Sequence, residues 1–356
     1  MENSKRFDNL DLMKALGILM VISLHVPLWN PDFMNQYDIS HIVQYMCRII
    51  SEGVPIFVTI NGFLLLKKTE FNIQKHIFKM LKMVGLIFVW GIILAIAGLA
   101  LDVNRAGFGI WDVFYAVLNI QVGANYTGVL WFLQNLLGVY LVFPILWYVY
   151  TNNYKLYQYL FIIVSMFVPG LGTVVLIRDA LATVIDTSLL STLIDFINRF
   201  NPIGNGWYLF YFMLGGIIWN RLEWIQRNRV FLSFMGVLSW PLAFSVGFYI
   251  SKATGVTYNP AFNYGSVFMI CFLVGFFAFT LPIKCNCVFM KILCSVGKNT
   301  FGMYLSHFLF IFIVNNRYRL ESARDHLAAF FVVCISSYLF SIIMSKIPRA
   351  SRIIEL

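Results

Sequence analysis

Asn9-Leu-Asp-Leu-Met-Lys14-Ala-Leu-Gly-Ile-Leu-Met-Val-Ile-Ser-Leu-His25 is the first apolar stretch of the chain, and it carries a lysine and a histidine eleven residues apart. Eleven steps of about 100° return a helix to within roughly 20° of its starting direction, so the two side chains share one face. A rise of about 1.5 Å per residue separates them by about 16 Å along the axis. Because ionisable groups are costly in a bilayer, such residues face protein or a polar cavity. The stretch therefore predicts a membrane helix with a polar path along one side.

The composition indicates an integral membrane protein. Of the 356 residues, 60% are hydrophobic and 12% are charged, whereas soluble domains carry about 25% charged residues. The first apolar stretch contains Lys14 and has no small-residue cleavage site, so we interpret it as a retained helix and not as a signal peptide. We expect a single all-α transmembrane domain over residues 1–356, with no appended soluble domain.

Ten apolar stretches are long enough to cross a bilayer as helices. We expect them at 10–29, 43–66, 83–101, 128–150, 157–177, 207–222, 230–251, 264–281, 297–316 and 326–345. Ten spans place 17 of the 26 lysines and arginines on the side that holds both termini, and 7 on the other side. The positive-inside rule makes the first side, with both termini, cytoplasmic.

The two longest outer loops, 102–127 and 178–206, are rich in glycine, asparagine and aromatic residues. Aromatic side chains beside Asp and Asn suit sugar rings, which stack on the rings and bond through their hydroxyls. An interfacial aromatic belt is the alternative interpretation.

A basic segment follows the second stretch. Lys79 and Lys82 fall on one helical face beside the membrane. A cluster of ammonium groups there suits a phosphorylated ligand that arrives from the cytoplasm. Setting the topology, or contact with anionic lipid, is the alternative.

The second stretch itself contains polar residues. Pro55 and the pair Asn61-Gly62 predict a kink or a close approach of backbones. Arg48 and Glu52 lie one turn apart, which predicts an ion pair inside the membrane. Structural pairing and a role in the site are both open for Glu52, and we keep it among the candidate catalytic residues.

Five motifs occur in the order typical of the acyltransferase 3 family of membrane-bound acyltransferases, which the chain resembles. They are Leu10-Asp11 with Lys14 and His25; Ile60-Asn61-Gly62-Phe63-Leu64; Lys79-x-x-Lys82; Trp131-Phe132-Leu133 with Tyr140 and Pro144; and Gly297 with Tyr304-Leu305 and His307. The chain departs from the family at Asn61, where serine is usual, and at its lysines 14, 79 and 82, where arginine is commoner. Lysine binds phosphate as a point charge, without the bidentate fork of arginine.

The resemblance implies ten helices, a cytoplasmic acyl-CoA donor and an acceptor hydroxyl on the outer face, commonly on a sugar of a surface glycan. On this basis we expect an acetyl-CoA-dependent O-acetyltransferase of the bacterial cytoplasmic membrane. Its acceptor would be a surface polysaccharide or a lipid-linked saccharide. The expected partners are acyl-CoA, that acceptor and the lipid bilayer, with no nucleic acid; a homo-oligomer stays open.

The candidate site residues take roles within this reaction. His25 is expected to act as general base or transient acyl carrier, because a neutral imidazole accepts a proton near neutral pH. Lys14, Lys79 and Lys82 are expected to hold the donor phosphates, and Asn61 to polarise the thioester.

Other polar residues have weaker signals. His307 either orients His25 or the thioester, or is a buried histidine bonded to a neighbour. Trp131 and Tyr140 are interpreted as packing residues. The cysteines predict no disulfide framework, and the spacing of Cys287 and Cys294, with no histidine nearby, is poor for zinc, so no metal is expected.

Two functions of other classes compete with this prediction. A transporter or flippase of a polar lipid or solute would move its substrate without acyl transfer, but the chain lacks paired broken helices in two halves. A non-catalytic membrane sensor with the same fold is the other, and the intact Lys14 and His25 argue against it.

Overall fold

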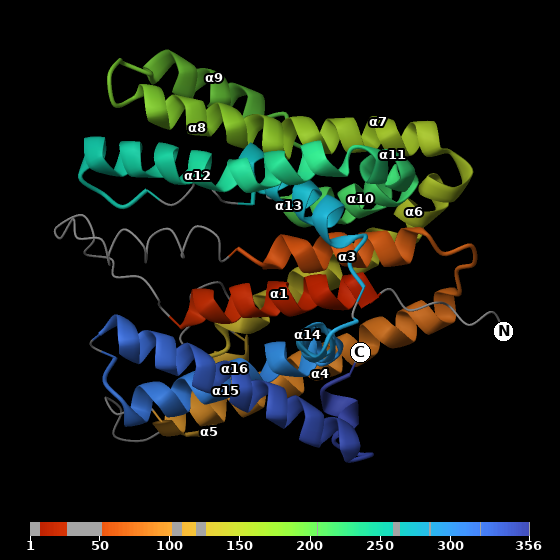
Figure 1. Ribbon diagram of the computed structural model, residues 1–356, viewed down its shortest axis with the longest axis vertical. Helices are drawn as coiled ribbons and strands as arrows, with labels where there is room; N and C mark the ends of the chain where they lie inside the picture. The colour runs from red at the N-terminus through yellow and green to blue at the C-terminus, as the bar shows by residue number, and fades with distance from the viewer. Residues whose placement is uncertain are drawn as a thin grey trace.

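The computed structural model consists of helices and their connections throughout the residues it describes. Those residues are 8–26, 52–101, 109–118, 126–204, 206–258, 264–284, 286–320 and 322–355. None of them belongs to a β-strand, and most helices run along one common direction (Figure 1). The all-α architecture predicted from the sequence is confirmed.

The helices have the following bounds in chain order: α1 (Asp8–His25), α3 (Val54–Leu66), α4 (Ile73–Leu101), α5 (Ile110–Leu118), α6 (Trp131–Asn152), α7 (Tyr154–Ser165), α8 (Leu171–Leu181), α9 (Ser188–Asn198), α10 (Trp207–Asn220), α11 (Leu222–Arg227), α12 (Arg229–Thr254), α13 (Val267–Thr280), α14 (Val288–Lys298), α15 (Thr300–Arg317) and α16 (Ala323–Lys346). Short 3₁₀ turns, Gly128–Leu130 and Ser351–Ile353, precede α6 and follow α16.

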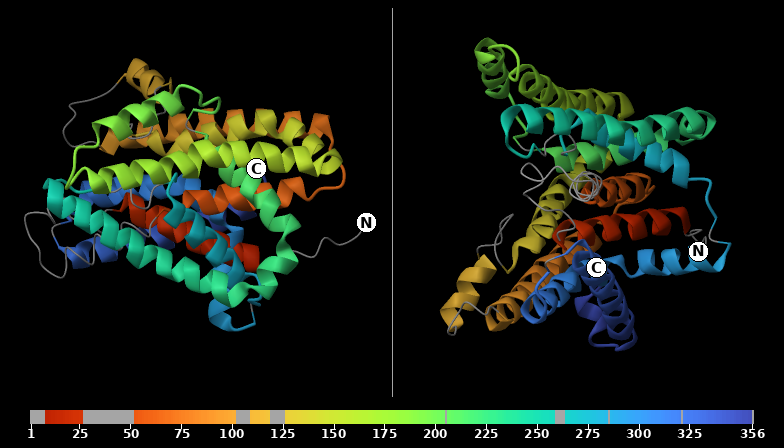
Figure 2. Two further views of the ribbon diagram at one scale, coloured as in Figure 1. Left: turned by 90° about the horizontal axis from the view of Figure 1, so that it is seen from above. Right: turned by 60° about the vertical axis from the view of Figure 1, so that its left-hand side comes forward.

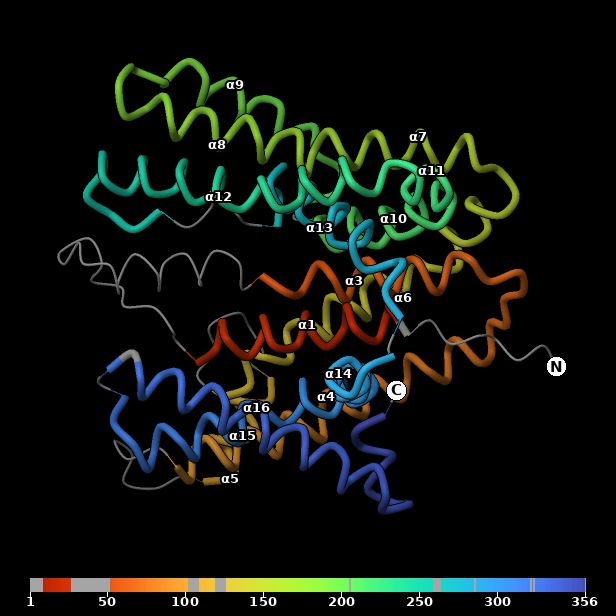
Figure 3. Tube along the Cα trace, in the orientation of Figure 1, coloured from red at the N-terminus to blue at the C-terminus, as the bar shows by residue number. Residues whose placement is uncertain are grey.

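The helices pack in three layers (Figures 1 and 3). One outer layer contains α7, α8, α9 and α12, and the other contains α4, α5, α15 and α16, as the turned views of Figure 2 also show. Between them lies α1, whose Met13, Ala15 and Ile18 are fully buried. The extensive helix contacts are α12 with α13, α3 with α10, α1 with α14, and α15 with α16. The helix that carries Lys14 and His25 is therefore central.

Each of the ten ranges expected to cross the membrane overlaps an observed helix. Within the described residues, five helical segments are long and apolar enough to cross a membrane by length and composition. They are Ile73–Leu101, Gly128–Asn152, Tyr154–Leu181, Arg229–Thr254 and Arg324–Lys346. The structure thus supports a multi-pass membrane protein, and the count of ten stays a prediction.

The third span begins earlier than predicted. The sequence places its start at residue 83, whereas α4 begins at Ile73. Lysine is a good helix former, so Lys75, Lys79 and Lys82 continue the helix beyond its apolar part. The helical face predicted for Lys79 and Lys82 beside the membrane is therefore part of the first three turns of α4.

The fifth span continues through its proline. A π-helical turn, Met166–Gly170, contains Pro169 and joins α7 to α8 without a break. The Thr173 hydroxyl donates to the Pro169 carbonyl at 2.6 Å. The local π geometry accommodates the proline within the helix, so the predicted range 157–177 extends to Tyr154–Leu181.

Four helices occupy segments that the sequence predicts mostly as loops. α5 and α9 lie within the predicted outer loops, and α11 and α14 lie within predicted cytoplasmic loops. Their exposed apolar residues include Trp111, Leu189 and Phe289. A search for stretches that span a bilayer misses such helices because they are short and apolar on one face only.

Glycines allow the backbones around α1 and α3 to approach closely. A Cβ added at Gly62 would overlap the Phe212 carbonyl of α10, and one added at Gly297 would overlap the Asp11 carbonyl of α1. Small residues at helix contacts are the usual means of tight packing in membranes. The close approach predicted at Asn61-Gly62 is confirmed, and Gly297 fixes α14 against the start of α1.

Candidate functional site

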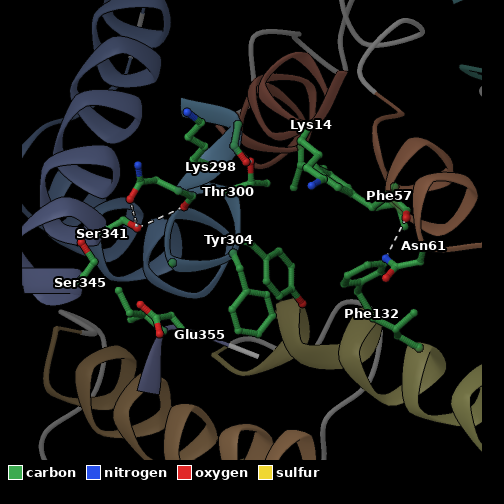
Figure 4. A pocket seen from close by; sticks show the side chains of 18 of the residues that line it. Lys14, Phe57, Asn61, Phe132, Lys298, Thr300, Tyr304, Ser341, Ser345 and Glu355 are labelled. Carbon is green, nitrogen blue, oxygen red and sulfur yellow. Dashed lines mark hydrogen bonds between the residues drawn. The ribbon is translucent and has the colours of Figure 1, made fainter. Parts of the chain in front are cut away.

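A cavity of about 560 Å³ opens between α1, α3, α4, α6, the α14–α15 junction, α16 and the residues that follow α16. Figure 4 shows polar side chains around it that come from distant parts of the chain. Lys14, Asn61 and Lys79 all line it. The tertiary structure therefore brings together three of the four residues predicted to bind the donor.

Lys14 enters the cavity from α1. Its Nζ lies 3.5 Å from Oδ1 of Asp11, one turn earlier, and Figure 4 shows the amine directed into the open space. The Asp11 side chain is 3% exposed and that of Lys14 is 29% exposed. The two residues are three positions apart, a spacing at which side chains of opposite charge on one helix meet. The buried Asp11 carboxylate fixes one side of the Lys14 ammonium group, and the 29% of the Lys14 side chain that is exposed leaves its other side open to a ligand.

Asn61 is held in place from two sides. Its Nδ2 donates to the Phe57 carbonyl at 2.9 Å, and its Oδ1 accepts from the Tyr140 hydroxyl at 3.1 Å. One N–H of the amide is left for a ligand in the cavity. Tyr140, interpreted from the sequence as a packing residue, is buried in the core as expected. It also lines the cavity and orients Asn61.

The two lysines of α4 differ in position. The Nζ of Lys79 lies over the Tyr140 ring, 5.3 Å from its centroid, and the residue lines the cavity. Lys82 is half-buried one turn further along α4 and does not line it. The aromatic face favours the cation of Lys79, so the structure distinguishes two residues that the sequence treats alike.

His25 and His307 are neighbours. Their ring centroids are 5.5 Å apart, and Phe308 packs against His25 edge-on at 4.9 Å. His307 is fully buried, and its Nδ1 lies 2.6 Å from the Tyr304 carbonyl. A carbonyl can only accept, so we assign the proton to Nδ1 and a lone pair to Nε2. That Nε2 is buried without a hydrogen-bond partner among the described residues.

The histidine pair lies just beyond the inner end of the cavity. Val21 of α1 and Tyr304 of α15 line the cavity. Val21 lies about one turn from His25, and Tyr304 lies about one turn from His307. Neither His25 nor His307 is itself among the lining residues. The Tyr304 hydroxyl donates to the Val129 carbonyl. This bond fixes the Tyr304 ring, which lines the cavity and lies 6.0 Å from the His307 ring between centroids.

Glu52 is not brought to the cavity. It is half-buried two residues before α3, and the cavity lining on that side begins at Val54. Arg48, with which Glu52 was predicted to pair, lies outside the described residues.

Sequence reasoning missed the opposite wall of the cavity. That wall carries Lys298, Thr300, Ser341, Ser345 and Glu355. Nε1 of Trp90 donates to the Ile353 carbonyl at 2.6 Å, which ties the residues after α16 to α4. Lys298 is next to Gly297 and Thr300 is three residues after it. The late motif that begins at Gly297 could therefore have pointed to these two residues. Nothing in the sequence indicated that α16 and residues 354–355 fold onto the same space.

The cysteines require one correction. Cys294 is disulfide-bonded, whereas the sequence predicted no disulfide framework. Cys287 is a free, exposed thiol. Spacing alone cannot reveal which sulfur atoms meet in three dimensions. Within the described residues no cluster of histidine, cysteine or acidic side chains has the makings of a metal site.

Comparison with known proteins identifies the family. The acyltransferase 3 family model, described as an acyltransferase domain, matches residues 7–346, so the chain belongs to this family. No curated protein and no solved structure matches the chain. Family and apolar helices together indicate a multi-pass membrane acyltransferase.

Proposed function

We propose, from membership of the acyltransferase 3 family, that this protein is an O-acetyltransferase that carries an acetyl group from cytoplasmic acetyl-CoA to a hydroxyl on the outer face of the bacterial plasma membrane. The acceptor is a sugar of a surface polysaccharide or of its lipid-linked precursor. The observation that carries the proposal is a lysine-lined cavity that extends along α1 to within about one turn of the His25–His307 pair.

The proposal includes ten spans and cytoplasmic termini. Two features support this orientation. The basic segments before α4, around α11 and after α16 lie at the same end of the bundle, on the right in Figure 1. The first turns of α1, with Lys14, lie at that end too. An excess of lysine and arginine marks the cytoplasmic side, so the donor cavity opens toward the cytoplasm.

The donor lies with its phosphates near Lys14 and Lys79 and its thioester toward the histidines. Ammonium groups beside a polar cavity attract and hold phosphate. The helix rise between Lys14 and His25 is about 16 Å, a distance that an extended pantetheine arm spans. The remaining N–H of Asn61 faces the same cavity, beside Tyr140 and Lys79, and we propose that it donates to the thioester carbonyl, where negative charge develops.

The transfer is an acyl substitution. The acceptor hydroxyl gives its proton to an imidazole and its oxygen attacks the acetyl carbon. The C–O bond forms, the C–S bond breaks, and the proton passes to the sulfur, so the products are the acetyl ester and CoA thiol. With its own Nδ1 bound to Tyr304, His307 offers Nε2 to relay or stabilise the proton that His25 collects.

An alternative path uses His25 as a carrier. Its imidazole nitrogen first takes the acetyl group from the thioester and then yields it to the acceptor. Both paths need the same pair of rings in contact, and both move the acetyl group across the membrane while CoA stays inside.

The experiment incubates purified protein with radiolabelled acetyl-CoA and extracted surface glycans or lipid-linked saccharides. Acetylated saccharide is expected with the wild type and not with His25→Ala. Movement of a polar lipid or solute without any label in the saccharide fraction would overturn the proposal in favour of transport.

A further inference from the structure

The wall of the cavity opposite Lys14 has no part in the reaction as proposed. It is formed by the α14–α15 junction, by α16 and by the residues after α16. Its one lysine is Lys298, the last residue of α14. Figure 4 shows Lys298 across the open space from Lys14, with its Nζ directed away from the centre of that space. The cavity therefore presents cations at two separate places.

The three lysines of the cavity differ in how their charges are engaged. Lys14 is paired with Asp11, and Lys79 lies over the Tyr140 ring. Lys298 is exposed, and among the described residues it makes no ion pair. Glu355, the carboxylate on the same wall, is not paired with it either. An anion at the rim thus meets a cation that no carboxylate already neutralises.

The backbone that carries Lys298 is firmly held. On one side Gly297 packs directly against the Asp11 carbonyl of α1. On the other side Asn299 donates from Nδ2 to the Ser295 carbonyl at 2.9 Å, and the buried Ser341 hydroxyl lies 3.1 Å from the Asn299 carbonyl. The attachment point is therefore fixed, and only the side chain has to order when a ligand binds.

Two cation positions match the chemistry of the proposed donor. CoA has a diphosphate, which leads to the pantetheine arm, and a separate phosphate monoester on its ribose. With the arm directed inward along α1, the diphosphate lies near Lys14 and Lys79 and the ribose phosphate stays at the rim. We infer that Lys298 binds this ribose phosphate and makes the enzyme prefer CoA to dephospho-CoA. The inference rests on the proposed function.

The test measures binding of CoA and of dephospho-CoA to the purified full-length protein by competition with radiolabelled acetyl-CoA. A charged hydrogen bond contributes enough that the wild type should bind CoA about tenfold more tightly than dephospho-CoA. Lys298→Gln should bind both equally, at the wild-type affinity for dephospho-CoA. Lys291→Gln is the matched control, since Lys291 is an exposed lysine of the same helix and does not line the cavity.

The outcomes separate this inference from the function beneath it. If the wild type binds both ligands equally, or if Lys298→Gln keeps the preference for CoA, the inference is wrong and the donor assignment stands. If Lys291→Gln loses the preference as well, general surface charge is responsible and the inference is again wrong. If the wild type binds neither ligand nor acetyl-CoA, the proposed donor is wrong, and the inference fails with it.

Discussion

Two cavities in this molecule are walled by apolar helices and differ in their polar groups. The cavity beside α1 contains three lysines and adjoins two histidines. The cavity between α12 and α13, of about 310 Å³, is lined by Ser233, Gly236, Val237, Trp240, Phe272, Gly275, Phe276 and Phe279. It contains no charged side chain among its described lining residues.

The difference separates chemistry from packing. Between α12 and α13, Gly236 and Gly275 lie so close that a Cβ on either would meet the backbone of the other helix. That contact associates two helices and leaves an apolar space suited to a hydrocarbon chain. Around α1, polar and ionisable side chains lie inside the protein, where placing them is energetically unfavourable. Such residues mark a functional site.

The largest expected effect is the loss of His25. His25→Ala should lower acetyl transfer by about 10²- to 10⁴-fold, because a positioned general base contributes about that much, while protein yield and melting temperature change little. Transfer of radiolabel to the saccharide, together with a melting curve, measures both. Activity within twofold of the wild type would remove His25 from the mechanism.

Next come the lysines of α4, which the structure places differently. Lys79→Gln should weaken acetyl-CoA binding about tenfold, the usual worth of one charged hydrogen bond. Lys82→Gln, its matched control, should change binding by less than about threefold, because Lys82 does not line the cavity and its half-buried charge acts on the donor only through the screened field. Direct titration with acetyl-CoA measures both. Equal losses would show that the cavity does not define the donor site.

The glycine contact of the other region should affect stability and not chemistry. Gly275→Leu inserts a side chain where α12 and α13 touch, and overpacking costs about 1–3 kcal/mol. We expect a lower melting temperature and an unchanged affinity for acetyl-CoA in the protein that stays folded. Gly85→Leu is the control, since no atom lies near an added Cβ there. A specific loss of acetyl-CoA binding would mean that the two regions are coupled.

The smallest expected effect comes from the hydrogen bond that orients Asn61. Tyr140→Phe removes the hydroxyl that donates to Oδ1 of Asn61 and leaves the ring under Lys79. Loss of one neutral hydrogen bond is worth about 1 kcal/mol, so kcat should fall about fivefold with KM nearly constant. Steady-state kinetics separates the two parameters, and a rise in KM alone would assign Tyr140 to donor binding.

Periodicity predicted the helices well where they are long and failed where they are short. Each of the ten expected ranges overlaps a helix, whereas the segments of α5, α9, α11 and α14 were expected as loops. The reason is that an apolar run of bilayer length has one stable solution, a helix that satisfies its own backbone. A short amphipathic segment is helical only when a membrane surface or a neighbouring helix covers its apolar face.

The candidate site was predictable to the extent that one helix or one motif held it. Lys14 and His25 lie on the single helix α1, and their placement follows from residue spacing. The Asp11–Lys14 pair follows from the same geometry. By contrast, the distinction between Lys79 and Lys82 depends on where Tyr140 of α6 lies, and no local pattern contains that information.

By itself, the sequence determined an apolar, all-helical protein, the common face of Lys14 and His25, and the ordered motifs of an acyltransferase family. These are properties of backbone hydrogen bonding and of the 3.6-residue helical period, which act within about twenty residues. Only the tertiary structure decided that His307 lies against His25 and that Lys298 faces Lys14 across one cavity. Those placements come from helix-on-helix packing at glycine contacts such as Gly297 with Asp11, where shape complementarity across nearly the whole chain sets the geometry.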